Sequence, residues 1–235
     1  MLAEVNTSVA ADGFSIVSDV VDLQRINDLL EGLADCSGKD SSRKRRGAVY
    51  AIRNLLATPV VREIASSDAM CELVGTVLGG SVRVIRGTLF DKTVDANWKV
   101  PWHQDLSIAV KERIEVEGFG PWSVKEGVVH VQPPRAVLEA MLTVRLHLDD
   151  CGADNAPLRV VSGSHSHGVL RPDQVARFAA LGPVTTCEVS RGGAVLMRPL
   201  ILHASSPAVL PAHRRVLHLE FTNAGLPGGL DWHWS

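Results

Sequence analysis

The 235-residue chain is predicted to be an α+β protein, in which a mostly helical segment, residues 1–80, precedes a β-rich segment, residues 81–235. In the first segment apolar residues recur at helical spacing. From Ser81 onward they form short or alternating runs between turn residues. Many short strands after a helical block favour a double-sheet core, a jelly roll or double-stranded β-helix, with the N-terminal helices packed on one face.

The helical segment is divided by its caps and breakers. Ser18 is expected to cap a helix whose apolar positions approximate a 3.6-residue period, namely Val21, Leu23, Ile26, Leu29, Leu30 and Leu33. Further helices are expected over 48–56, over 60–65 after Pro59, and over 69–78, where two glycines end the last one. These helices carry no evident chemistry, so we expect them to support one outer face of a sheet.

The β-rich segment is expected to contain strands over residues 82–90, 102–110, 142–148, 159–161, 185–189, 194–197, 200–204 and 216–222. A long insert, residues 111–134, separates the second strand from the third and contains Phe119 and Trp122. Loops of this length inside a compact domain are commonly functional covers. We therefore expect a single domain, residues 1–235, in which residues 111–134 form a lid over the site.

The bulk composition excludes several classes of protein. An apolar fraction of 46%, a charged fraction of 21% and a net charge of -2 are typical of a globular protein without a nucleic-acid partner. The basic run at 43–46 is interpreted as a solvated loop. Four widely spaced cysteines, no N-terminal leader pattern and no apolar stretch of membrane-spanning length predict a cytoplasmic protein without a membrane partner. The oligomeric state is not predicted.

A possible metal site is visible in the segment Trp102-His103-Gln104-Asp105. On a β-strand, His103 and Asp105 would project from the same face. His203, on a later strand, would supply a third ligand. Two histidines and one carboxylate, with the remaining positions open, suit non-haem Fe(II) chemistry. Arg214 would offer a planar, permanently charged guanidinium to the carboxylate of a co-substrate.

The His-x-Asp pair has two competitors in this chain, and its surroundings decide between them. His147 and Asp149 lead directly into a turn-rich string, so Asp149 is expected where a strand ends. His218-Leu-Glu220 is followed only by a tail rich in glycine and proline. The segment after Asp105 is an alternating apolar run that predicts a strand. The ligand prediction therefore rests on His103 and Asp105.

Several motifs resemble those of the phytanoyl-CoA dioxygenase family of Fe(II)- and 2-oxoglutarate-dependent oxygenases. They are Trp102-His-Gln-Asp105, Asp150-Cys-Gly-Ala-Asp-Asn155-Ala-Pro-Leu158, Ser162-Gly-Ser-His165 with Gly168, Leu202-His-Ala-Ser205 and His213-Arg-Arg215. The resemblance implies Fe(II), 2-oxoglutarate and O₂ as cofactor and co-substrates, with His103, Asp105 and His203 as iron ligands. It also implies that Arg214 pairs with the far carboxylate of 2-oxoglutarate. One departure is Ala156, where the family usually has glycine.

The same resemblance implies a dioxygenase that hydroxylates an unactivated C–H bond of a small metabolite, with release of succinate and CO₂. Further residues are predicted near the substrate or behind the ligands, namely Gln104, Trp122, Arg145, Lys92 and Thr143. For Arg145 a structural ion pair and contact with an acidic substrate are equally good interpretations. Arg215 competes with Arg214, because strand alternation directs only one of the two inward. No catalytic residue is predicted beyond the metal site.

A second class of function stays open on the residues alone. The same three ligands in a cupin-like protein would hold Zn²⁺ or Mn²⁺ for a non-redox isomerase or hydrolase. Arg214 argues against it, because that chemistry needs no dicarboxylate partner. A non-catalytic binder with a degenerate site is disfavoured by the complete ligand set. The basic side chains near the predicted site favour a carboxylated substrate.

Overall fold

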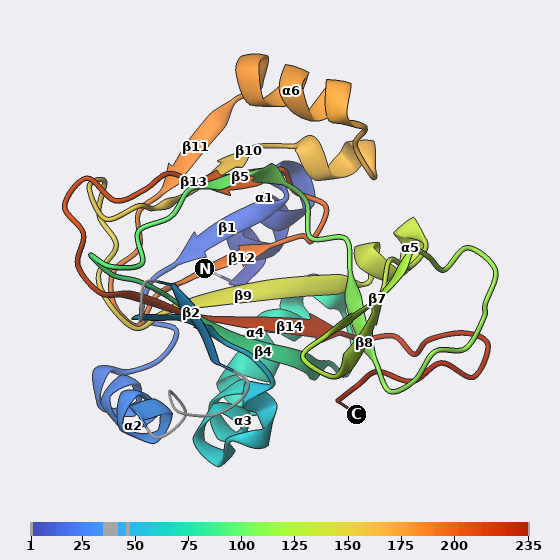
Figure 1. Ribbon diagram of the computed structural model, residues 1–235, viewed down its shortest axis with the longest axis horizontal. Helices are drawn as coiled ribbons and strands as arrows, with labels where there is room; N and C mark the ends of the chain where they lie inside the picture. The colour runs from blue at the N-terminus through green and yellow to red at the C-terminus, as the bar shows by residue number, and fades with distance from the viewer. Residues whose placement is uncertain (1, 35–41, 46–47, 235) are drawn as a thin grey trace.

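The computed structural model describes residues 2–34, 42–45 and 48–234 as three antiparallel sheets with helices on the outside (Figure 1). The seven-stranded sheet has the order β1 (Phe14–Val17), β12 (Ala194–Met197), β9 (Met141–His147), β14 (Arg214–Thr222), β4 (Arg83–Lys92), β3 (Ala48–Ile52) and β2 (Ser42–Arg45). The four-stranded sheet has the order β11 (Val184–Cys187), β10 (Leu158–Val161), β13 (His203–Ser205) and β5 (Val100–His103). The smallest sheet contains β6 (Ile108–Val110), β8 (Val128–Val131) and β7 (Trp122–Lys125).

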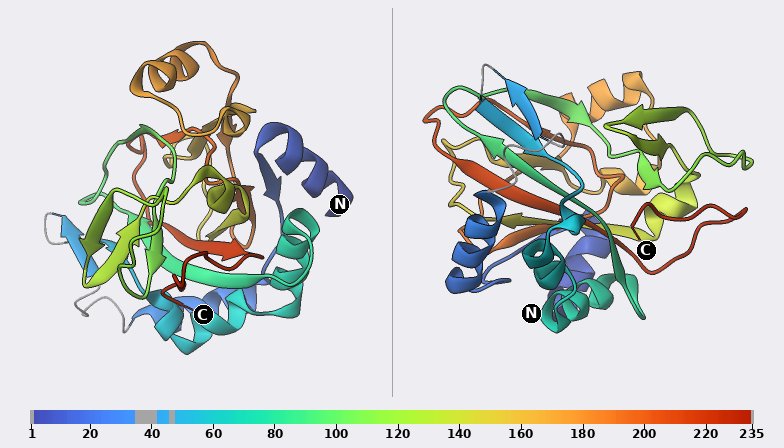
Figure 2. Two further views of the ribbon diagram at one scale, coloured as in Figure 1. Left: turned by 90° about the vertical axis from the view of Figure 1, so that its right-hand side faces the viewer. Right: turned by 60° about the horizontal axis from the view of Figure 1, so that its bottom comes forward.

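The four-stranded sheet faces the middle of the seven-stranded sheet, and this pair forms the predicted jelly roll (Figures 1 and 2). Strand β9 is buried along its whole length, and its two faces lie in different environments. Leu142, Val144 and Leu146 belong to the main apolar core. Thr143 and Arg145 alternate with them and therefore project from the opposite, inner face. The polar alternation in β9 thus places charged groups between the two sheets.

Helices cover the outer face of the large sheet, as predicted. They are α1 (Leu2–Asp12), α2 (Leu23–Ala34), α3 (Pro59–Ala65) and α4 (Asp68–Leu78). In α2, Ile26 and Leu29 are fully buried in the same core cluster as Leu146 and Leu219 of the sheet. Two further helices, α5 (Arg135–Glu139) and α6 (Pro172–Leu181), connect strands elsewhere. No helix among the described residues is long and apolar enough to cross a membrane.

The prediction of a helix over 48–56 is wrong. Residues 48–52 form β3, which pairs with β4 through Ala51 and Ile52, and only a 3-10 turn, Leu55–Ala57, follows. The β-branched and aromatic residues of this segment favour a strand once a neighbouring strand is available to pair with. The first segment also supplies β1 to the large sheet. In the basic run, Arg43 lies in β2 and pairs with Glu126, while residues 46–47 lie outside the described residues.

Two further predictions about the β segment need correction. Residues 102–110 do not form one strand: β5 ends at His103 in the four-stranded sheet, and β6 begins at Ile108 in the smallest sheet. The insert 111–134 is not irregular, because β7 and β8 form a hairpin within it. Phe119 and Trp122 pack into a separate apolar cluster with Ile108 and Val131. None of the described residues of this insert lines the central cavity, so a closing movement over the site stays a prediction.

Candidate metal centre

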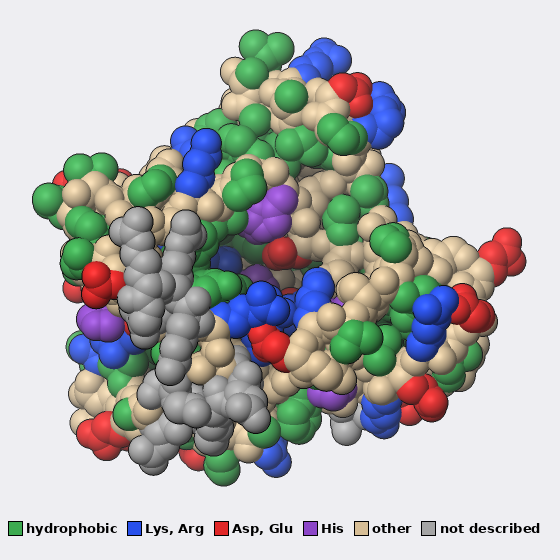
Figure 3. Space-filling view, viewed as in Figure 1, with side chains coloured by type: hydrophobic (Ala, Val, Ile, Leu, Met, Phe, Trp, Pro, Cys, Tyr) green, Lys and Arg blue, Asp and Glu red, His purple; other side chains and the backbone are tan. Residues whose placement is uncertain are grey.

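A cavity of about 240 Å³ lies between the two facing sheets and opens at the surface (Figure 3). Its lining is unusually rich in titratable side chains for the interior of a β-sandwich. The lining residues are Arg86, Thr88, Phe90, Trp98, Val100, His103, Asp105, Arg145, Leu158, His203, Ser205, Arg214, His218 and Glu220. This set includes all three predicted metal ligands and the predicted co-substrate arginine.

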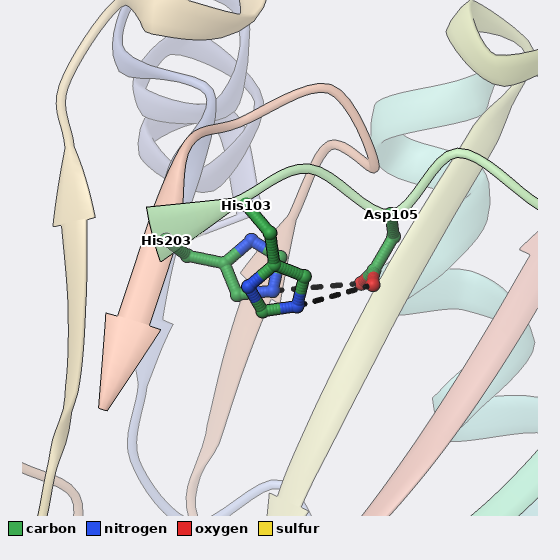
Figure 4. Close-up of side chains that lie close together, drawn as sticks. All are labelled: His103, Asp105 and His203. Carbon is green, nitrogen blue, oxygen red and sulfur yellow. Dashed lines mark ion pairs between the residues drawn. The ribbon is translucent and has the colours of Figure 1, made fainter. Parts of the chain in front are cut away.

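The three predicted ligands, all in the cavity lining, point towards one another (Figure 4). His103 ends β5 and His203 begins β13, and the two residues are directly opposite in the antiparallel pair. Their ring centroids are 4.2 Å apart. Asp105 reaches the rings from the segment after β5, with Nε2 to carboxylate oxygen distances of 3.8 Å for His103 and 3.7 Å for His203. One ligand atom from each residue lies within 4.8 Å of the other two.

Backbone carbonyls orient both imidazole rings. The Nδ1 atom of His103 is 2.8 Å from the carbonyl oxygen of Pro101, and that of His203 is 2.9 Å from the carbonyl oxygen of Ile201. Because a carbonyl oxygen only accepts, each Nδ1 must carry the proton. Each Nε2 therefore presents a lone pair towards Asp105, which is the arrangement that metal-binding histidines adopt.

The charge state of the triad also suits a cation. Burial would raise the pKa of Asp105, but the surrounding histidines and Arg145 lower it to about 2, so the group is a carboxylate. Burial lowers the pKa of His203 to about 4, which leaves that ring neutral. The Oδ2 atom of Asp105 is buried without a hydrogen-bond partner. A half-buried carboxylate whose inner oxygen lacks a donor, beside the Nε2 atoms of two histidines, fits a divalent metal ion.

Gln104, between the two ligands, points away from the metal site. Its Nε2 donates to the carbonyl oxygens of Gly168 at 2.8 Å and Leu200 at 2.6 Å, and its Oε1 accepts from the backbone N–H of Leu170 at 2.8 Å. The backbone N–H of Asp105 donates to the Pro199 carbonyl at 3.0 Å. These bonds hold the turn that brings Asp105 back towards His103, in place of the strand alternation that the sequence predicted.

We expect Gln104→Ala to lower the free energy of unfolding by about 1–3 kcal/mol, because three buried backbone groups lose their partner. The turn that carries Asp105 should loosen, and metal affinity should fall by about 10- to 100-fold. Urea unfolding and metal titration measure the two effects. The matched control is Gln24→Ala on the exposed face of α2, which should change neither quantity appreciably. Unaltered metal affinity in Gln104→Ala would contradict this role.

Arg214 lies on the inner face of β14 and is 3% exposed. Its Nη1 donates to the carbonyl oxygen of Ala156 and approaches Ser205 Oγ at 3.5 Å, while its Nε has no partner. Ala156 has a φ of 54°, the left-handed conformation that favours glycine. Although Ala156 replaces the glycine that is usual in the similar motif, it keeps the backbone conformation that glycine favours. Neighbouring Arg215 pairs instead with Asp149 at 2.6 Å and does not line the cavity.

Lys92 lies directly opposite Arg214 in the β4–β14 pair. Its Nζ donates to Ser205 Oγ at 2.8 Å and to the Ser206 carbonyl at 2.7 Å. The group is 1% exposed, and burial together with the charges of Arg214 and Arg145 lowers its pKa to about 7. Lys92 thus acts on the cavity through its charge, because its side chain is not part of the lining.

The other residues predicted near the substrate differ in whether they line the cavity. Arg145 lines the cavity, whereas Thr143 and Trp122 do not. The sequence indicates His218 and Glu220 only as a competing pair of metal ligands, whereas in the structure both line the cavity. The long polar alternation in the last strand could have indicated this position. Arg86, on the neighbouring strand, pairs with Glu220 at 3.1 Å.

Fold and site together define a jelly-roll protein with a two-histidine, one-carboxylate metal site beside a buried arginine. The family model for phytanoyl-CoA dioxygenase (PhyH) matches residues 9–216. The chain therefore belongs to the phytanoyl-CoA dioxygenase family, which confirms the resemblance seen in the sequence motifs. No match was found among curated proteins.

Solved structures share the fold along almost the whole chain. AviO1 from Streptomyces viridochromogenes Tue57 is 23% identical with a TM-score of 0.71, and the match covers 97% of both chains. The 2-oxoglutarate-dependent epimerase SnoN of nogalamycin biosynthesis is 18% identical with a TM-score of 0.71, covering 95% of this chain and 81% of its own. EctD from S. alaskensis, solved with 2-oxoglutarate and 5-hydroxyectoine, is 16% identical with a TM-score of 0.72, covering 92% and 74%.

Proposed function

We propose that this protein is an Fe(II)- and 2-oxoglutarate-dependent dioxygenase that hydroxylates a C–H bond of a small metabolite, with release of succinate and CO₂. The observation that carries the proposal is the convergence of three ligand atoms within 4.8 Å in a cavity that also contains the Arg214 guanidinium. Fe(II) is the ion best suited to two imidazoles, one carboxylate and open positions. A non-redox metalloenzyme would need the ligands but not the buried arginine.

The proposed iron and 2-oxoglutarate supply the oxidative chemistry when they are bound. The chain contributes orientation and charge. His103 and His203 present Nε2 lone pairs because the carbonyls of Pro101 and Ile201 hold their Nδ1 protons. Asp105 stays ionised and offsets part of the metal charge. His203 is buried, whereas His103 and Asp105 are half-buried where the cavity opens, so the metal position would be reachable from the solvent.

Arg214 provides the proposed site for the far carboxylate of 2-oxoglutarate. The buried guanidinium is held by the Ala156 carbonyl and contacts Ser205 and Cys151, while its Nε has no partner. N–H groups outside these contacts would form a charge-assisted pair of hydrogen bonds with the carboxylate. Burial lowers the pKa of Arg214 below its ordinary value, and a bound carboxylate would compensate the buried charge. The cavity would then place the co-substrate between the metal site and β14.

Anaerobic addition of Fe(II) and 2-oxoglutarate tests the proposal directly. A visible charge-transfer band should form only when both are present, and aerobic turnover should yield succinate. Reaction with ¹⁸O₂ and a library of small metabolites should give products that carry one labelled oxygen atom. Products of unchanged composition would indicate epimerisation in place of hydroxylation. Products lacking two hydrogens would indicate ring closure. Absence of the band would reject the cofactor assignment.

The affinity for 2-oxoglutarate should fall as the pH rises above about 7. The groups facing Lys92 are Arg214, Arg145 and Cys151, and the two arginines help to lower its pKa to about 7. A bound dianion favours the charged ammonium, so binding above that pH takes up a proton. The dissociation constant should rise by up to about tenfold per pH unit. Calorimetry from pH 6 to pH 9 measures it.

Lys92→Met provides the control, since its dissociation constant should be higher at pH 6 and nearly independent of pH. In the free protein the effect of pH on stability has the opposite sign to its effect on 2-oxoglutarate affinity. Lys92 binds fewer protons when folded than when unfolded between its lowered pKa of about 7 and the ordinary value of 10.5. Its contribution to the free energy of unfolding therefore rises with pH over this interval. Equal pH profiles for wild type and Lys92→Met would contradict the assignment.

A further inference from the structure

Arg145 is a buried cation of the cavity without a carboxylate partner. The side chain is 7% exposed and lines the cavity. It makes no ion pair among the residues that the structure describes, and its Nε has no hydrogen-bond partner. Burial lowers the pKa of Arg145 to about 10, so the group stays charged at neutral pH. An uncompensated buried guanidinium is costly, which suggests that a ligand completes it.

A neighbouring hydrogen-bond chain holds the guanidinium in place. Arg145 Nη1 lies 3.0 Å from His218 Nδ1, and arginine can only donate, so this nitrogen of His218 accepts. His218 Nε2 then carries the proton and faces Glu220 at 3.3 Å. Glu220 also pairs with Arg86 at 3.1 Å. One carboxylate thus serves two arginines, and this group of four side chains carries one positive charge.

The remaining charges of the cavity do not offset Arg145. If the proposed function holds, Fe(II) and Arg214 contribute three positive charges, and Asp105 and 2-oxoglutarate contribute three negative charges. His147 is neutral because burial lowers its pKa to about 3. Burial raises the pKa of Cys187 to about 12, so the nearby thiol adds no negative charge. Lys92, which takes up a proton when 2-oxoglutarate binds, adds positive and no negative charge. The loaded cavity therefore retains the positive charge of Arg145.

Cations also gather where the cavity meets the solvent (Figure 3). Arg86 lines the cavity. Burial, with a contribution from the charge of Arg86, lowers the pKa values of both Arg53 and Lys125. Arg53 is 3.8 Å from Glu126, whereas Lys125 makes no ion pair within the described part of the chain. A positive rim attracts anions towards the interior.

We propose that the primary substrate is an anion, and that its carboxylate or similar oxyanion pairs with Arg145. The inference rests on the proposed function and specifies its substrate class. A planar guanidinium held by His218 can donate two parallel hydrogen bonds to a carboxylate. Such a pair would fix the substrate relative to the metal site, so Arg145 is a specificity-determining residue.

Benzoate and its uncharged analogue benzamide test this assignment in the full-length protein. The protein is first loaded anaerobically with Fe(II) and 2-oxoglutarate, and formation of the charge-transfer band tests the proposed function separately. Calorimetry then measures the affinity for each probe while the band is monitored. We expect benzoate to bind the wild type about tenfold more tightly than benzamide, or better. Absent or equal binding of the two probes would overturn the proposal.

Arg145→Gln should remove the preference for benzoate over benzamide and leave the charge-transfer band intact. Arg145→Lys should keep part of the preference for benzoate. The matched control is Arg159→Gln, because Arg159 stacks on Trp102 at 5.3 Å and does not line the cavity. The control should retain the wild-type preference. If Arg145→Gln weakens 2-oxoglutarate binding and keeps the benzoate preference, Arg145 belongs to the co-substrate site and the proposal fails.

Discussion

Asp105→Ala is expected to abolish metal binding and substrate-coupled succinate formation while the jelly roll stays folded. The carboxylate is the only anionic member of the triad, and its Oδ2 makes no hydrogen bond that folding requires. Two imidazoles alone bind Fe(II) weakly, because the cation loses its only anionic ligand. Affinity for Fe(II) should fall by several orders of magnitude, as measured by anaerobic titration, and circular dichroism should be unchanged.

The competing His-x-Asp pair offers a matched control. Asp149→Asn removes the carboxylate that pairs with Arg215 outside the cavity, at 2.6 Å. This variant should lose some stability and keep metal binding and turnover, since Asp149 lies away from the triad. His203→Ala should behave like Asp105→Ala. Near-normal iron affinity in both triad variants would remove the basis of the metal assignment.

Arg214→Gln should chiefly raise the concentration of 2-oxoglutarate required for turnover. Loss of a buried charge-assisted pair of hydrogen bonds costs about 1.5–3 kcal/mol, which corresponds to a dissociation constant about 10- to 150-fold larger. Affinity for Fe(II) in the absence of co-substrate should stay the same. Anaerobic titration with 2-oxoglutarate, followed by the charge-transfer band, measures the first effect, and titration with Fe(II) alone measures the second.

A second probe separates Arg214 from other cations of the cavity. Pyruvate has the keto acid of 2-oxoglutarate and lacks the far carboxylate, so its affinity should be the same in wild type and Arg214→Gln. Arg215→Gln is the matched substitution one residue along the chain, where the side chain pairs with Asp149. It should leave the 2-oxoglutarate requirement unchanged. An increased requirement in Arg215→Gln alone would transfer the role to Arg215.

Much of the architecture was predictable because it depends on local periodicity. The helices α2, α3 and α4 follow from apolar spacing and breakers, and β12 was predicted with its observed ends, Ala194–Met197. The prediction that Ser18 caps α2 is wrong, because the helix begins at Leu23 and the Asp22 side chain accepts from the Arg25 backbone N–H. The segment 48–56 was misassigned because short apolar runs fit a helix or a strand equally well. Its conformation was decided by pairing with Phe90 and Leu89 of β4, which is a contact across the chain.

The three predicted ligands meet in the structure, but not through the geometry that the sequence predicted. The sequence indicated His103 and Asp105, but it placed them on one strand. The strand ends at His103, and the Gln104 side chain bonds to two distant loops. Asp105 therefore reaches the metal site through a turn. Such a turn depends on hydrogen bonds with Gly168 and Leu200, far along the chain, and local spacing does not encode them.

The sequence by itself determined the chemistry: two imidazoles, one carboxylate and an arginine, in motifs that belong to one family. Tertiary structure alone decided which charges meet. It paired Arg215 with Asp149 and joined Arg145 to Glu220 through His218. Among the described residues it left the cavity guanidinium groups of Arg145 and Arg214 without a directly paired carboxylate. The physical reason is that residue identity fixes what a side chain can donate or accept. The net charge of a cavity depends instead on strand register and on burial from both sheets.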